Sequence, residues 1–305
     1  MNKRQVIGSL MLFTAALIWG GSYVAQKDAL NYVGPITFMF ARSAASVIFL
    51  APMVLAYRQF DDIGKSLDSA QKRRRTKLTL KVGTVAGIVF GSGVCLQQIG
   101  QIYTSVGKAA FITGIYIVWV PIGSFIVMRI RSGPKLWLAV FLAVIGLYVL
   151  TINGNQPINK GDIYCFLGAI LMAIHILILG RYANSADGVL LSLQQYLSTA
   201  VVMMVLMFIF EKPSLNSIFA GWKPLLYTSL LSNAVGGTLQ IFGQKRLDAS
   251  VASLIMSLEA PLAVIAGLIL LNERLTTKEL IGCVLMFVAI LLAQWPTSVK
   301  NKKQA

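Results

Sequence analysis

Apolar residues occur along this chain in runs of about 20 residues, which short polar segments separate. Within each run the apolar positions are continuous and do not alternate, as is typical of membrane-spanning helices and not of barrel strands. A helix of about 20 residues is long enough to cross a bilayer. The pattern therefore predicts an all-α integral membrane protein with ten transmembrane helices, at residues 6–26, 34–57, 82–103, 108–128, 135–152, 162–181, 188–210, 223–244, 249–271 and 278–295.

The composition and the distribution of charge fit this interpretation. Hydrophobic residues make up 56% of the chain and charged residues only 12%, whereas about a quarter of the residues in a soluble domain are charged. The net charge of +16 raises the question of nucleic-acid binding. If the N-terminus is cytoplasmic, however, 19 of the 27 Lys and Arg residues fall on the cytoplasmic side and seven on the outer side, with Arg42 inside a helix. This asymmetry predicts a multi-pass protein of the inner (plasma) membrane with both termini in the cytoplasm, and it explains the charge without nucleic acid.

Three local features that could indicate other functions are interpreted as parts of the membrane domain. The run from Lys72 to Arg75 lies in the longest predicted loop, residues 58–81, and is expected to contact anionic lipid headgroups. The first apolar segment has no convincing signal-peptide cleavage site, so it is expected to stay as a helix. The three cysteines lack the spacing of a metal site and are expected to be packing residues: Cys95, Cys165 and Cys283.

A repeat is the most informative feature of the sequence. LQQIGQ at 96–101 returns as LQIFGQ at 239–244, an offset of 143 residues. The matched positions carry Gly and Gln, which membrane helices use sparingly, so a chance match between apolar helices is a poor explanation. We interpret the chain as a duplication, with a first repeat at 1–153 and a second at 154–305. Each repeat has five helices, an odd number, so the second would enter the membrane from the opposite side and form a 5+5 inverted-topology repeat, as in many secondary transporters.

Several motifs resemble a known family. The first helix carries AALIWGGSYVAQK at 15–27, and the second half carries SLEAP at 257–261 followed by NERLT at 272–276. Together with Arg42 and the stretch TSVGKAAFITG at 104–114, these segments resemble the EamA branch of the drug/metabolite transporter superfamily. The resemblance implies ten helices, cytoplasmic termini, a central cavity and, mostly, export of amino acids, metabolites or drugs. One departure is that the segment equivalent to NERLT in the first half, MRIRSGP at 128–134, lacks an acid.

Two charged side chains, Arg42 and Glu259, are predicted to lie deep in the hydrocarbon region, where a charge is costly and usually faces a cavity or a partner. Under one hypothesis Glu259 binds and releases a proton and couples transport to protons. Under the other, the two residues form a permanent ion pair that joins two helices. The sequence leaves both hypotheses open.

The remaining candidates for a substrate cavity are polar or aromatic. The four repeated glutamines either contact the substrate or bond neighbouring helices. His175, the only histidine, is either a proton relay or a packing residue. Pro121 and Pro261 predict bends in their helices. The full candidate set, besides Arg42 and Glu259, is Trp19, Tyr23, Gln97, Gln101, Tyr116, Trp119, His175, Gln195, Asn233, Gln240 and Gln244.

These features favour a secondary transporter that exports small metabolites, such as amino acids or drugs, by alternating access. No nucleotide-binding motif is present, and a single histidine with one deep acid argues against a membrane enzyme. We therefore expect no catalytic residues, no metal site and no cofactor. The expected partners are a small-molecule substrate and membrane lipids. The alternative is a passive facilitator or channel of the same fold for a neutral metabolite.

Overall fold

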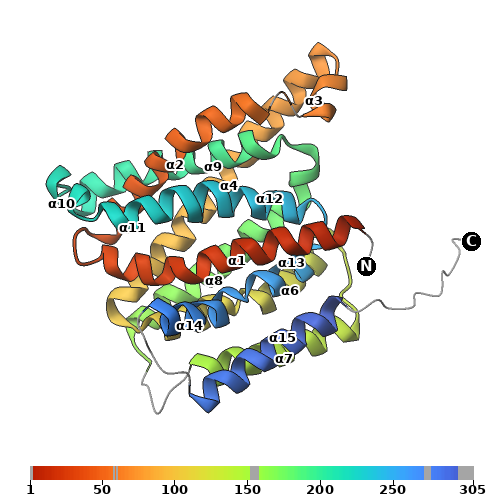
Figure 1. Ribbon diagram of the computed structural model, residues 1–305. Coiled ribbons are helices and arrows are strands. Elements are labelled where there is room, and N and C mark those ends of the chain that lie inside the picture. The colour runs from red at the N-terminus through yellow and green to blue at the C-terminus, as the bar shows by residue number, and fades with distance from the viewer. Residues whose placement is uncertain (1–2, 58, 60, 152–157, 271–275, 295–305) are drawn as a thin grey trace, which may run out of the picture.

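The computed structural model describes residues 3–57, 59, 61–151, 158–270 and 276–294, and within these ranges every regular element is a helix (Figure 1). Six segments are long and apolar enough to cross a membrane, and shorter apolar helices accompany them at Pro134–Leu150, Ala249–Ala263 and Leu280–Gln294. The chain is therefore an all-helical, multi-pass membrane protein of about ten crossing helices. The helices are α1 (Lys3–Ala29), α2 (Pro35–Tyr57), α3 (Asp62–Ser66), α4 (Ser69–Tyr103), α5 (Val106–Gly114), α6 (Tyr116–Met128), α7 (Pro134–Thr151), α8 (Lys160–Tyr182), α9 (Gly188–Phe210), α10 (Leu215–Ala220), α11 (Trp222–Leu226), α12 (Thr238–Gln244), α13 (Ala249–Met256), α14 (Glu259–Leu270) and α15 (Thr277–Gln294), with a 3-10 turn η1 (Ala183–Ser185) and a π-helical stretch η2 (Tyr227–Gly237).

Most helix boundaries agree with the apolar runs to within a few residues, and α4 is the main exception. It begins at Ser69, so the expected loop at 58–81 is largely helical and the basic run lies on a helix. A capping box starts it: the Gln71 amide donates to Asp68 Oδ1 at 2.7 Å, and the Asp68 amide donates to Gln71 Oε1 at 3.1 Å. Hydropathy did not predict this helical segment because the segment is polar. Lys, Arg and Gln favour helices in water, but they lower the hydropathy that marks a membrane helix.

Three of the crossing segments are irregular. The segment expected at 108–128 is interrupted at Ile115, between α5 and α6, and the segment expected at 249–271 is interrupted at Ser257 and Leu258, between α13 and α14. Both interruptions precede the prolines at which bends were expected. The segment expected at 223–244 contains η2, whose wider turn is a feature often found at functional sites.

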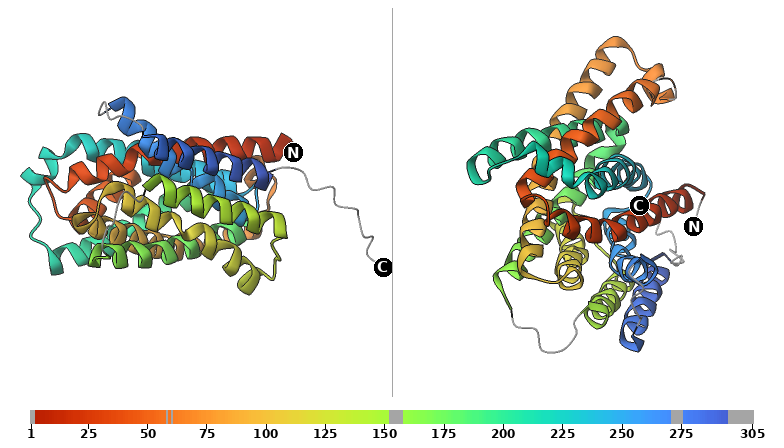
Figure 2. Two further views of the ribbon diagram at one scale, coloured as in Figure 1. Left: turned by 90° about the horizontal axis from the view of Figure 1, so that it is seen from below. Right: turned by 60° about the vertical axis from the view of Figure 1, so that its left-hand side comes forward.

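The two halves of the chain are interleaved. Helix α4 packs mainly against α8 and α9, α2 packs against α9, and α1 packs against α12, α14 and η2. Helices α7 and α15 form a separate pair along one side of the bundle (Figures 1 and 2). Helix α3 and the start of α4 extend beyond the bundle at the end where α1 begins, whereas α10 lies at the opposite end (Figure 1). The centre of the bundle is therefore lined by both halves.

Close helix approach depends on glycine at two of these contacts. A Cβ at Gly87 of α4 would lie 2.2 Å from the carbonyl oxygen of Gln195 in α9. A Cβ at Gly282 of α15 would lie 2.6 Å from the amide nitrogen of Leu150 in α7. Small residues of this kind let membrane helices pack backbone to backbone.

Candidate functional site

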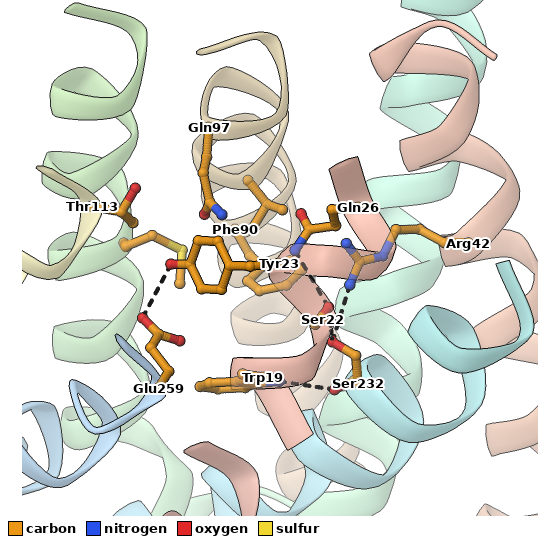
Figure 3. A pocket seen from close by; sticks show the side chains of 12 residues that line it. Trp19, Ser22, Tyr23, Gln26, Arg42, Phe90, Gln97, Thr113, Ser232 and Glu259 are labelled. Atoms are coloured by element: carbon orange, nitrogen blue, oxygen red, sulfur yellow. Dashed lines mark hydrogen bonds between the residues drawn. The ribbon is translucent and has the colours of Figure 1, made fainter. Parts of the chain in front are cut away.

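A small cavity of about 40 Å³ lies in the middle of the bundle (Figure 3). A cavity of this volume has room for only a few water molecules. Five of the sequence candidates line it: Trp19, Tyr23, Arg42, Gln97 and Glu259. The other lining residues, which sequence reasoning missed, are Ser22, Gln26, Phe90, Val94, Thr113, Met172 and Ser232.

Helical spacing explains most of the missed residues. On α1, Ser22 and Gln26 lie three and seven positions after Trp19, so all three share one face of the helix with Tyr23. The same argument joins Phe90 and Gln97, which are seven positions apart on α4. Extending each candidate by whole turns would have found these positions from the sequence.

On one side of the cavity, polar groups hold the Arg42 guanidinium in place. Its Nη2 donates to Asn233 Oδ1 at 2.7 Å and to Ser232 Oγ at 3.2 Å, and both acceptors belong to η2. Asn233 is fixed in turn, because its Nδ2 donates to Ser46 Oγ at 3.1 Å. The Trp19 indole donates to the Ser232 carbonyl at 3.0 Å. The π-helical stretch thus supplies the groups that orient Arg42.

On the other side of the cavity, Glu259 begins α14 directly after the helix interruption. The hydroxyls of Tyr23 and Tyr116 each lie 3.4 Å from Glu259 Oε1, which is long for a hydroxyl–carboxylate hydrogen bond. Glu259 is 7% exposed and Arg42 is 2% exposed. Figure 3 shows the two charged groups on opposite sides of the cavity, with Trp19, Ser22 and Tyr23 between them.

Of the two hypotheses for Arg42 and Glu259, the permanent ion pair is wrong as a direct contact in this structure. The ion pairs found among the described residues join Arg75 to Asp61 and Lys108 to Asp162. Depth in the membrane brought Arg42 and Glu259 to one cavity, but the rotation of each helix about its axis selected different partners. Arg42 faces η2, whereas Glu259 faces the tyrosines of α1 and α6.

The other sequence candidates lie outside the cavity lining. Tyr116 and Asn233 contact lining residues, as described above. His175 Nε2 and Gln195 Oε1 form a buried hydrogen bond of 2.8 Å, and the His175 ring packs on Phe90 with centroids 5.2 Å apart; both hypotheses for His175 stay open. Three of the others are placed by single contacts: Trp119 packs on Phe166, Gln244 donates to the Ile176 carbonyl, and Gln101 accepts from Lys27 through its backbone carbonyl. Gln240 is buried and its amide nitrogen has no partner among the described residues.

The two ends of the bundle differ. At the end opposite the start of α1, Lys108 of α5 and Asp162 of α8 form an ion pair of 2.6 Å, with side chains 8% and 7% exposed. At the end where α1 begins, a cavity of about 650 Å³ lies beside the segment 244–251. This segment is the repeat equivalent of 101–108, and its Asp248 matches Ser105, so both residues precede the first turn of a helix. The segment at 101–108 therefore ends in an ion pair at one end of the bundle, whereas its repeat equivalent at 244–251 borders a cavity at the other end.

A polar contact outside the crossing segments joins α3 to α4. Arg75 donates to Asp61 with Nη1 at 2.5 Å and with Nη2 at 3.3 Å. Burial by itself raises the pKa of Asp61, but hydrogen bonds from Arg75 and from the Gly64 amide outweigh it and hold the pKa below its ordinary value. This ion pair stabilises the projecting helical hairpin when Asp61 is ionised.

No metal centre is found in the part of the chain that the structure describes, since no three His, Cys, Asp or Glu residues are grouped there. The three cysteines are buried and none forms a disulfide among the described residues, as expected of packing residues. The first four residues of NERLT, at 272–275, lie outside the described residues, so the place of this motif relative to the cavity stays an expectation.

Comparison with known proteins identifies the family. The EamA-like transporter family matches this chain twice, over residues 6–152 and 159–295. An uncharacterized transporter of Archaeoglobus fulgidus is 26% identical over 290 residues, which cover 95% of this chain and 86% of that protein. The uncharacterized transporter YyaM of Bacillus subtilis is 24% identical, covering 93% and 92%. A solved crystal structure with 14% identity superposes with a TM-score of 0.74 over 94% of this chain and 96% of the other, which supports the fold. The chain belongs to the EamA-like transporter family, whose members are membrane transporters and not enzymes.

Proposed function

We propose that this protein is a secondary transporter that exports small metabolites, such as amino acids or drugs, from the cytoplasm by alternating access. The observation that carries the proposal is the buried polar cavity between helices of both repeats, with Arg42 and Glu259 on its walls. Charged groups at this depth are costly and mark substrate or ion pathways. A cavity of about 40 Å³, which holds only a few water molecules, is too small for most amino acids, so their binding requires the surrounding helices to move.

The repeats are proposed to have opposite orientations in the inner (plasma) membrane, with both termini in the cytoplasm and the boundary near residues 153 and 154. Two contacts support this arrangement. Tyr116 and Glu259, which are 143 residues apart and equivalent in the repeat, touch each other. A Cβ at Gly146 of α7 would lie 3.0 Å from the carbonyl oxygen of Gly282 in α15; these glycines are 136 residues apart and match in the repeat when a few residues are gapped. Equivalent residues meet only beside an axis that relates the repeats.

In this topology the described conformation is closed to the outside. Lys108 and Asp162 would close the outer end, while the cavity of about 650 Å³ at the other end would open to the cytoplasm. Export would then require the outer ion pair to part after a substrate enters from the cytoplasmic side. Glu259 is the residue we propose for coupling to protons, since it is the acid on the cavity wall.

The test is counterflow in proteoliposomes that contain the purified protein and unlabelled amino acids. The expected result is uptake of labelled substrate against its gradient, faster when a pH gradient is imposed. A matched pair of variants reports on the cavity: Ser22→Phe, which fills it, should abolish counterflow, and Ser69→Phe, on an exposed turn of α4, should leave it unchanged. Steady electrical conductance or flux without counterflow would instead establish the passive facilitator or channel.

A further inference from the structure

The Arg42 guanidinium is buried without a counter-ion among the described residues. Its Nη2 makes both of its hydrogen bonds, while Nε and Nη1 have no partner there. In the described part of the chain, Arg42 makes one cation–π contact, with Phe38, whose ring centroid lies 5.8 Å from the Arg42 Cζ. Removing a guanidinium from water without pairing it is one of the most unfavourable arrangements in a protein interior.

The neighbouring groups do not neutralise this charge. Ser232 and Asn233 offer neutral oxygens, and Glu259 contacts two tyrosine hydroxyls instead. The same groups hold the guanidinium rigidly, because Asn233 is fixed by Ser46 and Ser46 Oγ donates to the Arg42 carbonyl at 2.6 Å. A preorganised cation with unused donors, facing a cavity, is a binding site for an anionic group.

The opposite wall of the cavity has the opposite charge. Glu259 uses Oε1 for both tyrosine contacts, and its other carboxylate oxygen points toward Trp19 in Figure 3. Between the two charges lie the Trp19 indole, the Phe90 ring and the Ser22 hydroxyl. Apolar faces between a cation and an anion fit a molecule that has a charged group at each end and an apolar middle.

We propose that Arg42 binds the carboxylate of the transported molecule and that Glu259 receives its cationic group, so that the substrates are small zwitterions with one carboxylate. This inference rests on the proposed transport function and specifies its substrate class. Neutral drugs and dianions would lack one of the two contacts. The narrow cavity would widen when such a molecule enters from the cytoplasmic side.

The experiment measures ligand-induced shifts in the melting temperature of the purified protein, because a ligand that binds the folded state stabilises it. The probes are matched sets: each amino acid with its primary amide and its methyl ester. The expected result is that one or more acids bind at least 10-fold more tightly than their amide and ester. Arg42→Gln should remove this preference and Arg42→Lys should keep part of it. Arg181→Gln, an exposed arginine at the end of α8, is the control and should leave it unchanged.

Three results would overturn the assignment: equal binding of acids and amides, acid binding that survives Arg42→Gln, or no stabilisation by any acid at millimolar concentration. If Arg42→Gln does not fold, the Arg42→Lys variant and the comparison of acids with amides and esters in the unmodified protein still test whether Arg42 binds the carboxylate. Counterflow separates this inference from the transport function. Carboxylate-dependent binding without exchange would refute transport alone, and exchange of amides as fast as of acids would refute the Arg42 site alone.

Discussion

Asp162→Asn is predicted to open the end of the bundle that the proposed topology places outside. The substitution keeps the shape of the side chain and an acceptor oxygen for the Asn159 amide, which now donates to Asp162 Oδ2 at 2.9 Å. It removes the counter-ion of Lys108, whose ammonium lies 2.6 Å from the same oxygen. Removing one partner of a buried ion pair costs about 3–5 kcal/mol. The cost applies to the closed conformation, because Lys108 is hydrated once this end opens.

At about 1.4 kcal/mol per tenfold, the full cost would shift the balance between closed and open forms by about 2 to 3.6 powers of ten. The amide oxygen of the substituted side chain recovers part of this energy by accepting a hydrogen bond from Lys108, so we expect a shift of at least tenfold. The assay is the rate at which a membrane-impermeant maleimide, added from outside, labels a cysteine placed at Gln26 in a variant without the native cysteines. Gln26 is 4% exposed on the cavity wall, so labelling requires opening.

Two further variants test whether loss of the Lys108–Asp162 ion pair is the cause of faster labelling. Asp248→Asn makes the same chemical change at the other end of the bundle, where the described residues show no ion pair for Asp248, and should leave outside labelling unchanged. Replacing both Lys108 and Asp162 with Met and Leu should restore slow labelling, because an apolar pair of similar volume often substitutes for a buried ion pair. Unchanged labelling in a folded Asp162→Asn protein would refute the role of this pair in closing the outer end.

Three other outcomes are expected. Gly282→Ala should destabilise the protein by about 1–3 kcal/mol through overpacking between α7 and α15, whereas Gly133→Ala, whose Cβ would meet nothing within 4 Å, should not; equal melting temperatures would contradict the close packing. Glu259→Gln should abolish acceleration of counterflow by a pH gradient and also slow exchange without a gradient, because it removes the contact proposed for the cationic group of the substrate; unchanged pH dependence would remove the coupling role. Asp61 has a lowered pKa in the folded protein, so its contribution to stability is present above its unfolded pKa, about 4, and is lost as the pH falls through the lower folded value; hydrogen exchange of α3 should speed up in that range, and Arg75→Gln should remove the effect.

The crossing helices could be predicted because each depends on its own composition. A run of about 20 apolar residues has few alternatives to a membrane helix, so its position follows from the sequence with little information about the rest of the chain. The basic start of α4 could not be found in this way, since hydropathy separates the membrane from water and does not separate helix from loop in water. Asp68 followed three positions later by Gln71 matches a capping box, and this sequence signal would have identified the start.

The site was predicted only in part because side-chain partners depend on the rotation of each helix. Arg42 and Glu259 were found from their charge and depth, but the amides and hydroxyls that hold Arg42 come from η2, a stretch whose π-helical geometry has no simple sequence signature. The repeated glutamines illustrate the same limit: Gln97 reaches the cavity, whereas its equivalent Gln240 does not line it. Equal sequence positions in the two repeats thus have unequal surroundings.

The contact between Tyr116 and Glu259 has a consequence for how this protein arose. Where two copies of a fold meet, a residue beside the axis faces its own counterpart, so identical subunits can place only like residues there. Two glutamates with oxygens as near as the 3.4 Å observed here would repel each other, and two tyrosines would bring no charge. If the repeats have the proposed inverted arrangement, joining both copies in one polypeptide allows the two positions to differ. A single acid in the middle of the bundle is an arrangement that an assembly of two identical half-size chains could not produce.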